Sequence, residues 1–229
     1  MNASVSLIGR VLPATVHVRS EVPSEHPSAR LLGTERMGSG TIIDPAGLIL
    51  TVNYVVLGAS EVRVTLLDGR EYLAEVVRHD FGSGLGLLRI AEGRLPSLPL
   101  RRSSELRLGD EVFLVASVGE GEARISNGGV SHLGPFDANW EYVLERAIMT
   151  TAMNPGLGGG PLLDLQGRVV GVVSLNLNEI GRFSLVIPSE YYLDARSGTS
   201  RPSTASTTSP ALRPAVSPGP PGSTPAMTT

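Results

Sequence analysis

The groups with the clearest chemical potential are the main-chain N–H donors of one short loop, Asn154–Leu162. Its nine residues include four glycines and two prolines, a composition that excludes a helix and a plain strand. Glycine permits backbone angles that other residues avoid, and it lets a second chain approach closely. We therefore predict a tight loop whose N–H groups face a cleft. The simpler interpretation is a glycine-rich connection between two strands.

Side chains suited to nucleophilic catalysis are scattered along the chain. The histidines are His17, His26, His79 and His132. A serine or threonine nucleophile needs a base and an orienting group within hydrogen-bond contact. His79 adjoins Asp80 and lies close to Ser83 in the sequence, but a surface or half-buried strand residue is the simpler interpretation of this histidine. Thr150 and Thr151 precede the glycine-rich loop and have no adjacent base.

Composition limits the class of protein and its partners. The chain has 229 residues, no cysteine and a formal net charge of -3. Nearly balanced charges provide no strong field that would attract nucleic acid or anionic lipid, and the absence of cysteine excludes disulfides and thiolate metal sites. No apolar run reaches membrane-spanning length, and Met1–Val18 makes a poor signal peptide. We expect a cytoplasmic protein that binds neither nucleic acid nor membrane, with no metal and no other cofactor.

Short strands separated by turn residues fill most of the chain. Glu61–Leu67 alternates Val62, Val64 and Leu66 with polar residues, and Asp68-Gly69 is a tight hairpin turn. Many short strands with closely spaced turns are typical of an all-β barrel or sandwich. Two similar halves joined by Glu92–Ser104 indicate two barrels, residues 14–95 and 105–188.

Helices are expected only at the two ends of this unit, residues 1–196. Val5–Leu12 has helical spacing of apolar residues, and a short helix at Glu190–Ala195 follows Ser189, whose hydroxyl is predicted to cap it. The composition then shifts to Ser, Thr, Pro, Ala and Gly. Such a segment cannot bury enough apolar surface to fold, so we predict that Ser197–Thr229 is disordered. A linker to a further module and an O-glycosylated stalk are the alternatives.

A series of short motifs occurs in a recognisable order between Val5 and about Ala195. These motifs are Gly38–Asp44, Gly47–Thr51, Asn53–Val56, Asp68–Arg70, Leu85–Ile90, Leu108–Asp110, Asn127–Ser131, Asn154–Leu162, Gln166–Val172 and Val186–Ser189. Together they resemble the HtrA/Deg family of trypsin-like serine proteases, which has G-S-G-x-I-I, G-x-I-L-T-N, N-H-V-V, D-L-A-L-L-K and N-P-G-N-S-G-G-P-L at the matching places. The resemblance implies an all-β fold of two packed six-stranded antiparallel β-barrels of the trypsin/chymotrypsin type, with short terminal helices and a cleft between the barrels.

The family cleaves peptide bonds with a Ser-His-Asp triad, in which serine attacks, histidine transfers the proton and aspartate orients the histidine. In this sequence the histidine of N-H-V-V aligns with Tyr54. The aspartate of D-L-A-L-L aligns with Gly84, and the serine of N-S-G-G-P aligns with Gly158. All three catalytic groups are therefore predicted to be absent. The resemblance also places the oxyanion-hole N–H groups at Gly156 and Gly158, which need no side chain and can persist.

Tyr54 has two interpretations. A phenol titrates near pH 10 and is a poor base at neutral pH. Its ring either fills the space between the barrels or packs on Val55 and Leu87 with its hydroxyl in water. We predict that Tyr54 partly plugs the cleft.

The leading hypothesis is a non-catalytic protease homologue that binds protein or peptide segments or scaffolds an assembly. The alternatives are an active serine endopeptidase with relocated catalytic residues and a structural domain without a ligand. The family usually adds a C-terminal PDZ domain and forms trimers through its N-terminal region. No PDZ-like segment is expected after Ala195, and a homo-oligomer is left open.

Overall fold

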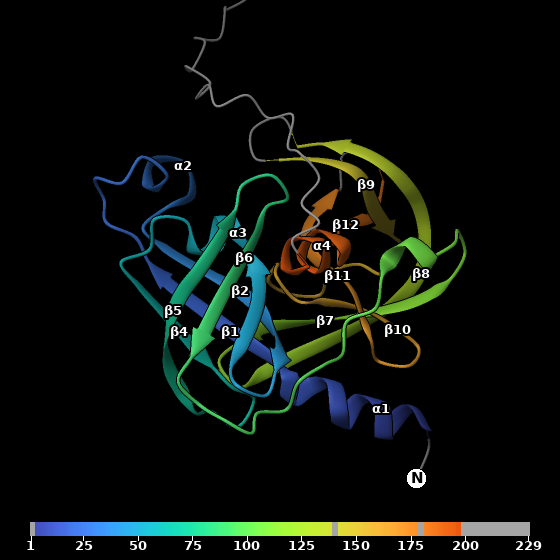
Figure 1. The fold of residues 1–229 in the computed structure, drawn as a ribbon, viewed down its shortest axis with the longest axis horizontal. Helices are drawn as coiled ribbons and strands as arrows, with labels where there is room; N and C mark the ends of the chain where they lie inside the picture. The colour runs from blue at the N-terminus through green and yellow to red at the C-terminus, as the bar shows by residue number, and fades with distance from the viewer. Residues whose placement is uncertain (1–2, 139–141, 178–180, 198–229) are drawn as a thin grey trace, which may run out of the picture.

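Two closed six-stranded antiparallel barrels form the body of the computed structural model, which describes residues 3–138, 142–177 and 181–197 (Figure 1). The first barrel has the strand order β1-β2-β3-β6-β5-β4 and the second β10-β11-β12-β9-β8-β7. The strands are β1 Thr15–Glu21, β2 Glu35–Asp44, β3 Leu48–Val52, β4 Glu61–Thr65, β5 Glu71–Asp80, β6 Leu85–Ile90, β7 Glu111–Gly119, β8 Glu122–Asp137, β9 Val143–Thr150, β10 Pro161–Asp164, β11 Val169–Leu177 and β12 Phe183–Pro188. The predicted fold class is confirmed.

Short helices lie at both ends of the unit, as predicted. They are α1 Ala3–Val11, followed by a 3-10 turn at Leu12–Ala14, and α4 Glu190–Arg196. Two further helices of one turn each, α2 Ala29–Leu32 and α3 Asn53–Val56, and a 3-10 turn at Ser103–Glu105 were not expected. Among the described residues, no helix is long and apolar enough to span a membrane. The segment predicted to be disordered, Ser197–Thr229, lies outside the described residues except for Ser197.

The predicted cap of the last helix is wrong. The Ser189 hydroxyl makes no capping bond to α4 and donates instead to the carbonyl oxygen of Arg101 at 2.5 Å. Arg101 belongs to the connection between the barrels, which offers a part-buried acceptor that the local sequence pattern does not reveal. The hydroxyl therefore ties α4 to this connection instead of capping the helix.

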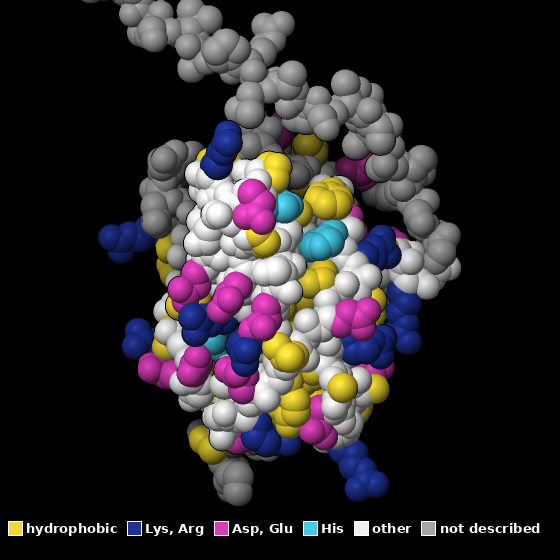
Figure 2. Space-filling model, turned by 90° about the vertical axis from the view of Figure 1, so that its left-hand side faces the viewer, with side chains coloured by type: hydrophobic (Ala, Val, Ile, Leu, Met, Phe, Trp, Pro, Cys, Tyr) yellow, Lys and Arg dark blue, Asp and Glu magenta, His cyan; other side chains and the backbone are white. Residues whose placement is uncertain are grey.

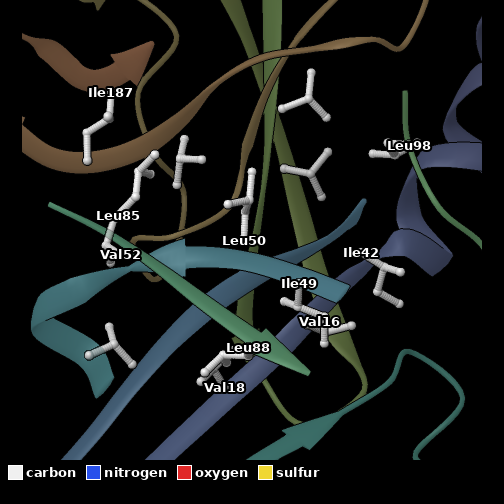
Figure 3. Close-up of a cluster of buried hydrophobic side chains, with 14 of the residues drawn as sticks. Val16, Val18, Ile42, Ile49, Leu50, Val52, Leu85, Leu88, Leu98 and Ile187 are labelled. Carbon is white, nitrogen blue, oxygen red and sulfur yellow. The ribbon is translucent and has the colours of Figure 1, made fainter. Parts of the chain in front are cut away.

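The alternation of side chains along the strands places one set inside each barrel and the other outside. Inside the first barrel lie Val16, Val18, Ile42, Ile49 and Leu88 (Figure 3). On the opposite side of the β3–β6 pair, Leu50 and Leu85 face Ile187 of β12 in the second barrel (Figure 3). Around Leu50 and Leu85 the outer face of β3 and β6 is thus buried between the barrels, so these two strands have apolar residues on both faces.

The outward face of the first barrel differs from this buried seam. Figure 2 shows acidic and basic side chains mixed over it, with hydrophobic side chains scattered among them. Arg19–Glu35 and Arg63–Glu61 are ion pairs on its strands, at 3.0 and 2.6 Å. Surface pairs of this kind contribute little to stability. The mixture of signs agrees with the nearly neutral chain.

Candidate functional site

Tyr54 lies on α3, directly after β3, and reaches across to the second barrel. Its hydroxyl donates to the carbonyl oxygen of Ser174 on β11 at 3.1 Å. The backbone of α3 is held by the buried Arg36, whose Nη1 donates to the carbonyl oxygens of Tyr54 at 2.8 Å and Leu57 at 3.0 Å. A hydroxyl free in water is therefore excluded for Tyr54, and its side chain bridges the two barrels.

Gly84, in the turn between β5 and β6, lies under the ring of a second tyrosine. Gly84 has a φ of +79°, in the left-handed region, and a Cβ added there would overlap ring atoms of Tyr142. Tyr142 is buried, and its hydroxyl shares a hydrogen bond of 2.5 Å with the Ser174 hydroxyl. An aspartate at position 84 has no room while this ring is in place.

Gly158 lies within the predicted glycine-rich loop, which is held against both barrels. The Ser39 N–H of the first barrel donates to the Gly158 carbonyl oxygen at 2.6 Å, and the Leu157 N–H donates to the Ser117 oxygen of the second barrel at 2.9 Å. A Cβ added at Gly158 would overlap the Tyr54 hydroxyl and lie 2.7 Å from the Ser174 oxygen. The space beside Gly158 is therefore filled by the tyrosine.

The structure thus brings the three aligned positions together around one residue, Ser174. Sequence reasoning missed both Ser174 and Tyr142. The only sequence signal for Tyr142 is its place at the start of an apolar run, Tyr142–Met149, which says nothing of its partner. We name the three side chains Tyr54, Tyr142 and Ser174 the tyrosine–serine cluster.

The predicted oxyanion-hole donors have different surroundings. The Gly156 N–H donates to Asn154 Oδ1 at 3.3 Å, within its own loop. Among the described residues, no hydrogen bond of the Gly158 N–H is recorded. An anion would have to compete with the Asn154 side chain for the Gly156 N–H. An oxyanion hole formed by Gly156 and Gly158 stays a prediction.

Two histidines contact serines in the described parts of the chain, as a relocated active site would require. His26 Nδ1 lies 2.8 Å from the Ser28 hydroxyl in a loop, and that hydroxyl accepts from Arg36 and donates to the Leu57 oxygen at 3.2 Å. His17 Nδ1 lies 3.1 Å from the Ser117 hydroxyl.

The second of these pairs is closed off from solvent. His17 and Ser117 are only 4% and 2% exposed. Ser117 donates its single hydroxyl proton to the Gly119 oxygen at 2.8 Å, so His17 is assigned as the donor toward Ser117. A histidine that donates to the serine cannot take its proton, and no substrate reaches a pair this deeply buried.

The other histidines contact no nucleophile. His79 Nδ1 contacts Asn53 Oδ1 at 2.6 Å and its ring stacks on Phe81, which fits the half-buried strand residue that the sequence suggested. His132 is exposed on β8. Within the described residues, no three His, Cys, Asp or Glu side chains are grouped so as to hold a metal ion.

Burial of His17 leads to a testable dependence of stability on pH. Desolvation lowers the pKa of His17 below its ordinary 6.5, against an opposing effect of Glu120. The unfolded chain then binds more protons than the folded one below about pH 6.5. The contribution of His17 to the free energy of unfolding is therefore fully present above that pH, and it is lost as the pH drops toward the folded-state pKa. We expect His17→Gln to reduce the slope of unfolding free energy against pH by up to about 1.4 kcal/mol per unit. Urea titrations between pH 5 and about 7.5 measure it, and an unchanged slope would contradict this account.

Comparisons with known proteins now identify the family. A model of the trypsin-like peptidase domain matches residues 38–172, and the curated relatives include a probable periplasmic serine endoprotease, DegP-like, of Hahella chejuensis, 41% identical over 69% of this chain. The chain belongs to the HtrA/Deg family of trypsin-like serine proteases. Serine protease HTRA1 of Xenopus laevis is 32% identical over 82% of the chain.

Solved HtrA-type structures agree with this family. The HtrA-type protease AlgW with tripeptide superimposes with a TM-score of 0.73 at 27% identity, over 86% of this chain and 63% of that one. The curated relatives are longer, because the matched region covers 34% of the Hahella protein and 41% of the Xenopus protein. The HtrA fold of this chain is therefore established, while the activity of its relatives is a separate question.

Proposed function

We propose that this HtrA-family chain is a catalytically inactive protease homologue that binds or scaffolds protein or peptide segments. The observation that carries the proposal is the tyrosine–serine cluster at the three aligned positions. Tyr54 stands where the family has histidine, and glycines 84 and 158 stand where it has aspartate and serine. No imidazole, carboxylate or hydroxyl is then available in the roles that acyl transfer requires.

Tyr54 does not substitute for the base. Its hydroxyl proton is donated to the Ser174 oxygen, and a phenol is uncharged at neutral pH. A water molecule activated at Gly158 would have no acceptor for its proton. Proton transfer by a positioned base is a necessary part of this chemistry.

Binding of an extended segment is supported by β11. Its pairing with β10 ends at Val172, whereas its pairing with β12 continues to Leu177. On the β10 side, no described strand pairs with the last residues of β11. An unpaired strand edge can accept a peptide as an additional strand, although Tyr54 already occupies the Ser174 oxygen.

The competing function is an active endopeptidase with relocated residues. The observations that favour it are the His26–Ser28 and His17–Ser117 contacts. The Ser28 hydroxyl donates to the Leu57 oxygen and the Ser117 hydroxyl to the Gly119 oxygen, and His17 and Ser117 are buried, all of which oppose it. A structural domain without a ligand is the remaining alternative.

We expect the purified protein to leave casein uncleaved and to remain unlabelled by a fluorophosphonate, because Gly158 stands at the position aligned with the family's nucleophilic serine. A DegP-like relative assayed in parallel provides the positive control. A peptide array should nevertheless retain the protein, without loss of the spotted peptides. Cleavage that survives removal of contaminating proteases would defeat the proposal, and an array without binding would favour the structural domain.

The compartment is proposed separately. The sequence predicts a cytoplasmic protein, whereas the DegP-like relatives are named periplasmic. We propose a cytoplasmic location, and recovery of the chain in a periplasmic fraction would contradict it.

A further inference from the structure

A pocket lies between the first barrel and α4, on a different side of β3 and β6 from the barrel interior. Its volume is about 370 Å³, within the range of small-molecule sites. Leucines from β3 and β6 and two tyrosines from α4 supply its apolar surface: Leu48, Leu50, Leu87, Tyr191 and Tyr192. It is distinct from the tyrosine–serine cluster, none of whose residues lines it.

The apolar floor follows from the strand register. Leu50 pairs with Leu87 across β3 and β6, and Leu48 pairs with Arg89. Leu50 is fully buried and belongs to the core that joins the barrels (Figure 3). The floor of the pocket is therefore the rim of this core, a place where ligand sites are often formed.

The wall made by α4 is held by several polar contacts. Glu190 accepts from the Ser103 hydroxyl and the Ser104 N–H, and Arg102 pairs with Asp194 at 2.8 Å. The Tyr191 hydroxyl accepts from the Glu145 N–H at 2.9 Å. These contacts come from the connection between the barrels and from β9, so the wall is fixed from two sides and the pocket is preformed.

The polar rim has more basic than acidic side chains, because Arg78, Arg89 and Arg196 line it with Asp44 and Asp80. Asp44 Oδ1 accepts from the Ala46 N–H at 2.8 Å, and Asp80 Oδ1 accepts from the Gly82 N–H at 3.1 Å, so one oxygen of each carboxylate is used in a turn. Asp80 also lies 3.9 Å from Arg78. Arg89 and Arg196 line the same pocket, and neither has an ion-pair partner among the described residues.

We propose that this pocket binds an amphipathic carboxylate, whose aliphatic part covers the leucine floor and whose carboxylate is bound by Arg89 and Arg196. A guanidinium presents a planar fork of donors that matches a carboxylate. The apolar lining favours an aliphatic body over a compact, highly charged anion. The proposal is independent of the proposed function, because it uses neither the cluster nor the β11 edge.

Calorimetric titration of the full chain with octanoate tests the proposal. We expect saturable binding of one octanoate per chain. The double variant Arg89→Gln/Arg196→Gln should weaken octanoate binding about tenfold or more, because charge-assisted hydrogen bonds are lost. Binding of octanol, which has the same chain without the charge, should be unchanged by the two substitutions.

Controls separate the site from general effects. Both arginines are exposed, so the double variant should keep the melting temperature of the wild type. Arg107→Gln, at an exposed arginine outside the pocket, should bind octanoate as the wild type does. Absence of saturable octanoate binding, or equal affinity in the double variant and the wild type, would overturn the proposal.

Discussion

The triple variant Tyr54→His/Gly84→Asp/Gly158→Ser is expected to show no measurable peptidase activity, although it carries all the groups of a catalytic triad. The reason is Tyr142, whose ring occupies the space that a side chain at position 84 needs. The new aspartate would be displaced from the new histidine. Loss of that carboxylate costs about ten-thousand-fold in turnover in triad enzymes.

A fourth substitution, Tyr142→Ala, should make activity detectable. It removes the ring over position 84 and the hydrogen bond to the Ser174 hydroxyl. Misplacement of a reacting group by 1 Å can cost about a hundredfold, so we expect the fourfold variant to exceed the triple variant by at least about that factor. The serine remains crowded, because a Cβ at position 158 lies 2.7 Å from the Ser174 oxygen, and the fourfold variant should stay slower than an HtrA protease.

A fluorogenic casein assay compares these variants, with melting temperatures to confirm that each is folded. Gly158→Ser alone is the matched single change and should be inactive. It supplies a hydroxyl with no base, and its Cβ meets the Tyr54 hydroxyl. Activity of the triple variant equal to that of the fourfold variant would show that Tyr142 does not obstruct position 84.

The fold could be predicted from sequence because it depends on local motifs, and the alignment of three positions with the family's triad rests on the same motifs. Turn glycines and alternating apolar residues occur at fixed spacings. Short sequence motifs give the alignment with the family at Asn53–Val56 and Asn154–Leu162. Even so, the α3 turn that carries Tyr54 was not predicted. Its backbone conformation depends on Arg36, which contacts it from β2.

That Tyr54 partly fills the cleft was predicted, but its partner Ser174 and the second ring, Tyr142, could not be predicted, because these contacts depend on packing between distant segments. Tyr54 and Ser174 are separated by 120 residues, and Tyr142 and Ser174 by 32. No residue close to Tyr142 in the sequence indicates that its ring covers Gly84. The error at Ser189 has the same origin, since the carbonyl of Arg101, from another segment, replaces the local capping bond.

The contact between Gly84 and Tyr142 should appear as a large coupling in unfolding free energy. Gly84→Ala adds a Cβ in the left-handed region, at about 1–2 kcal/mol, and forces it against the ring, at about 1–3 kcal/mol more. Tyr142→Ala alone should cost about 3–5 kcal/mol, as for other buried aromatic residues. In the double variant Gly84→Ala/Tyr142→Ala the ring is gone. The alanine at position 84 should then add only the backbone cost to that of Tyr142→Ala.

Gly69→Ala is the matched control for this cycle. Gly69 has a φ of +85°, close to that of Gly84, but nothing lies within 4 Å of a Cβ added there. Its alanine variant therefore measures the backbone cost alone, and Gly84→Ala should exceed it by about 1–3 kcal/mol. Urea denaturation of the four proteins of the cycle and of Gly69→Ala gives the coupling directly. The account of the filled site would fail if Gly84→Ala and Gly69→Ala lowered the unfolding free energy equally. It would also fail if Gly84→Ala cost the same with and without Tyr142→Ala, because the ring would then not occupy this space.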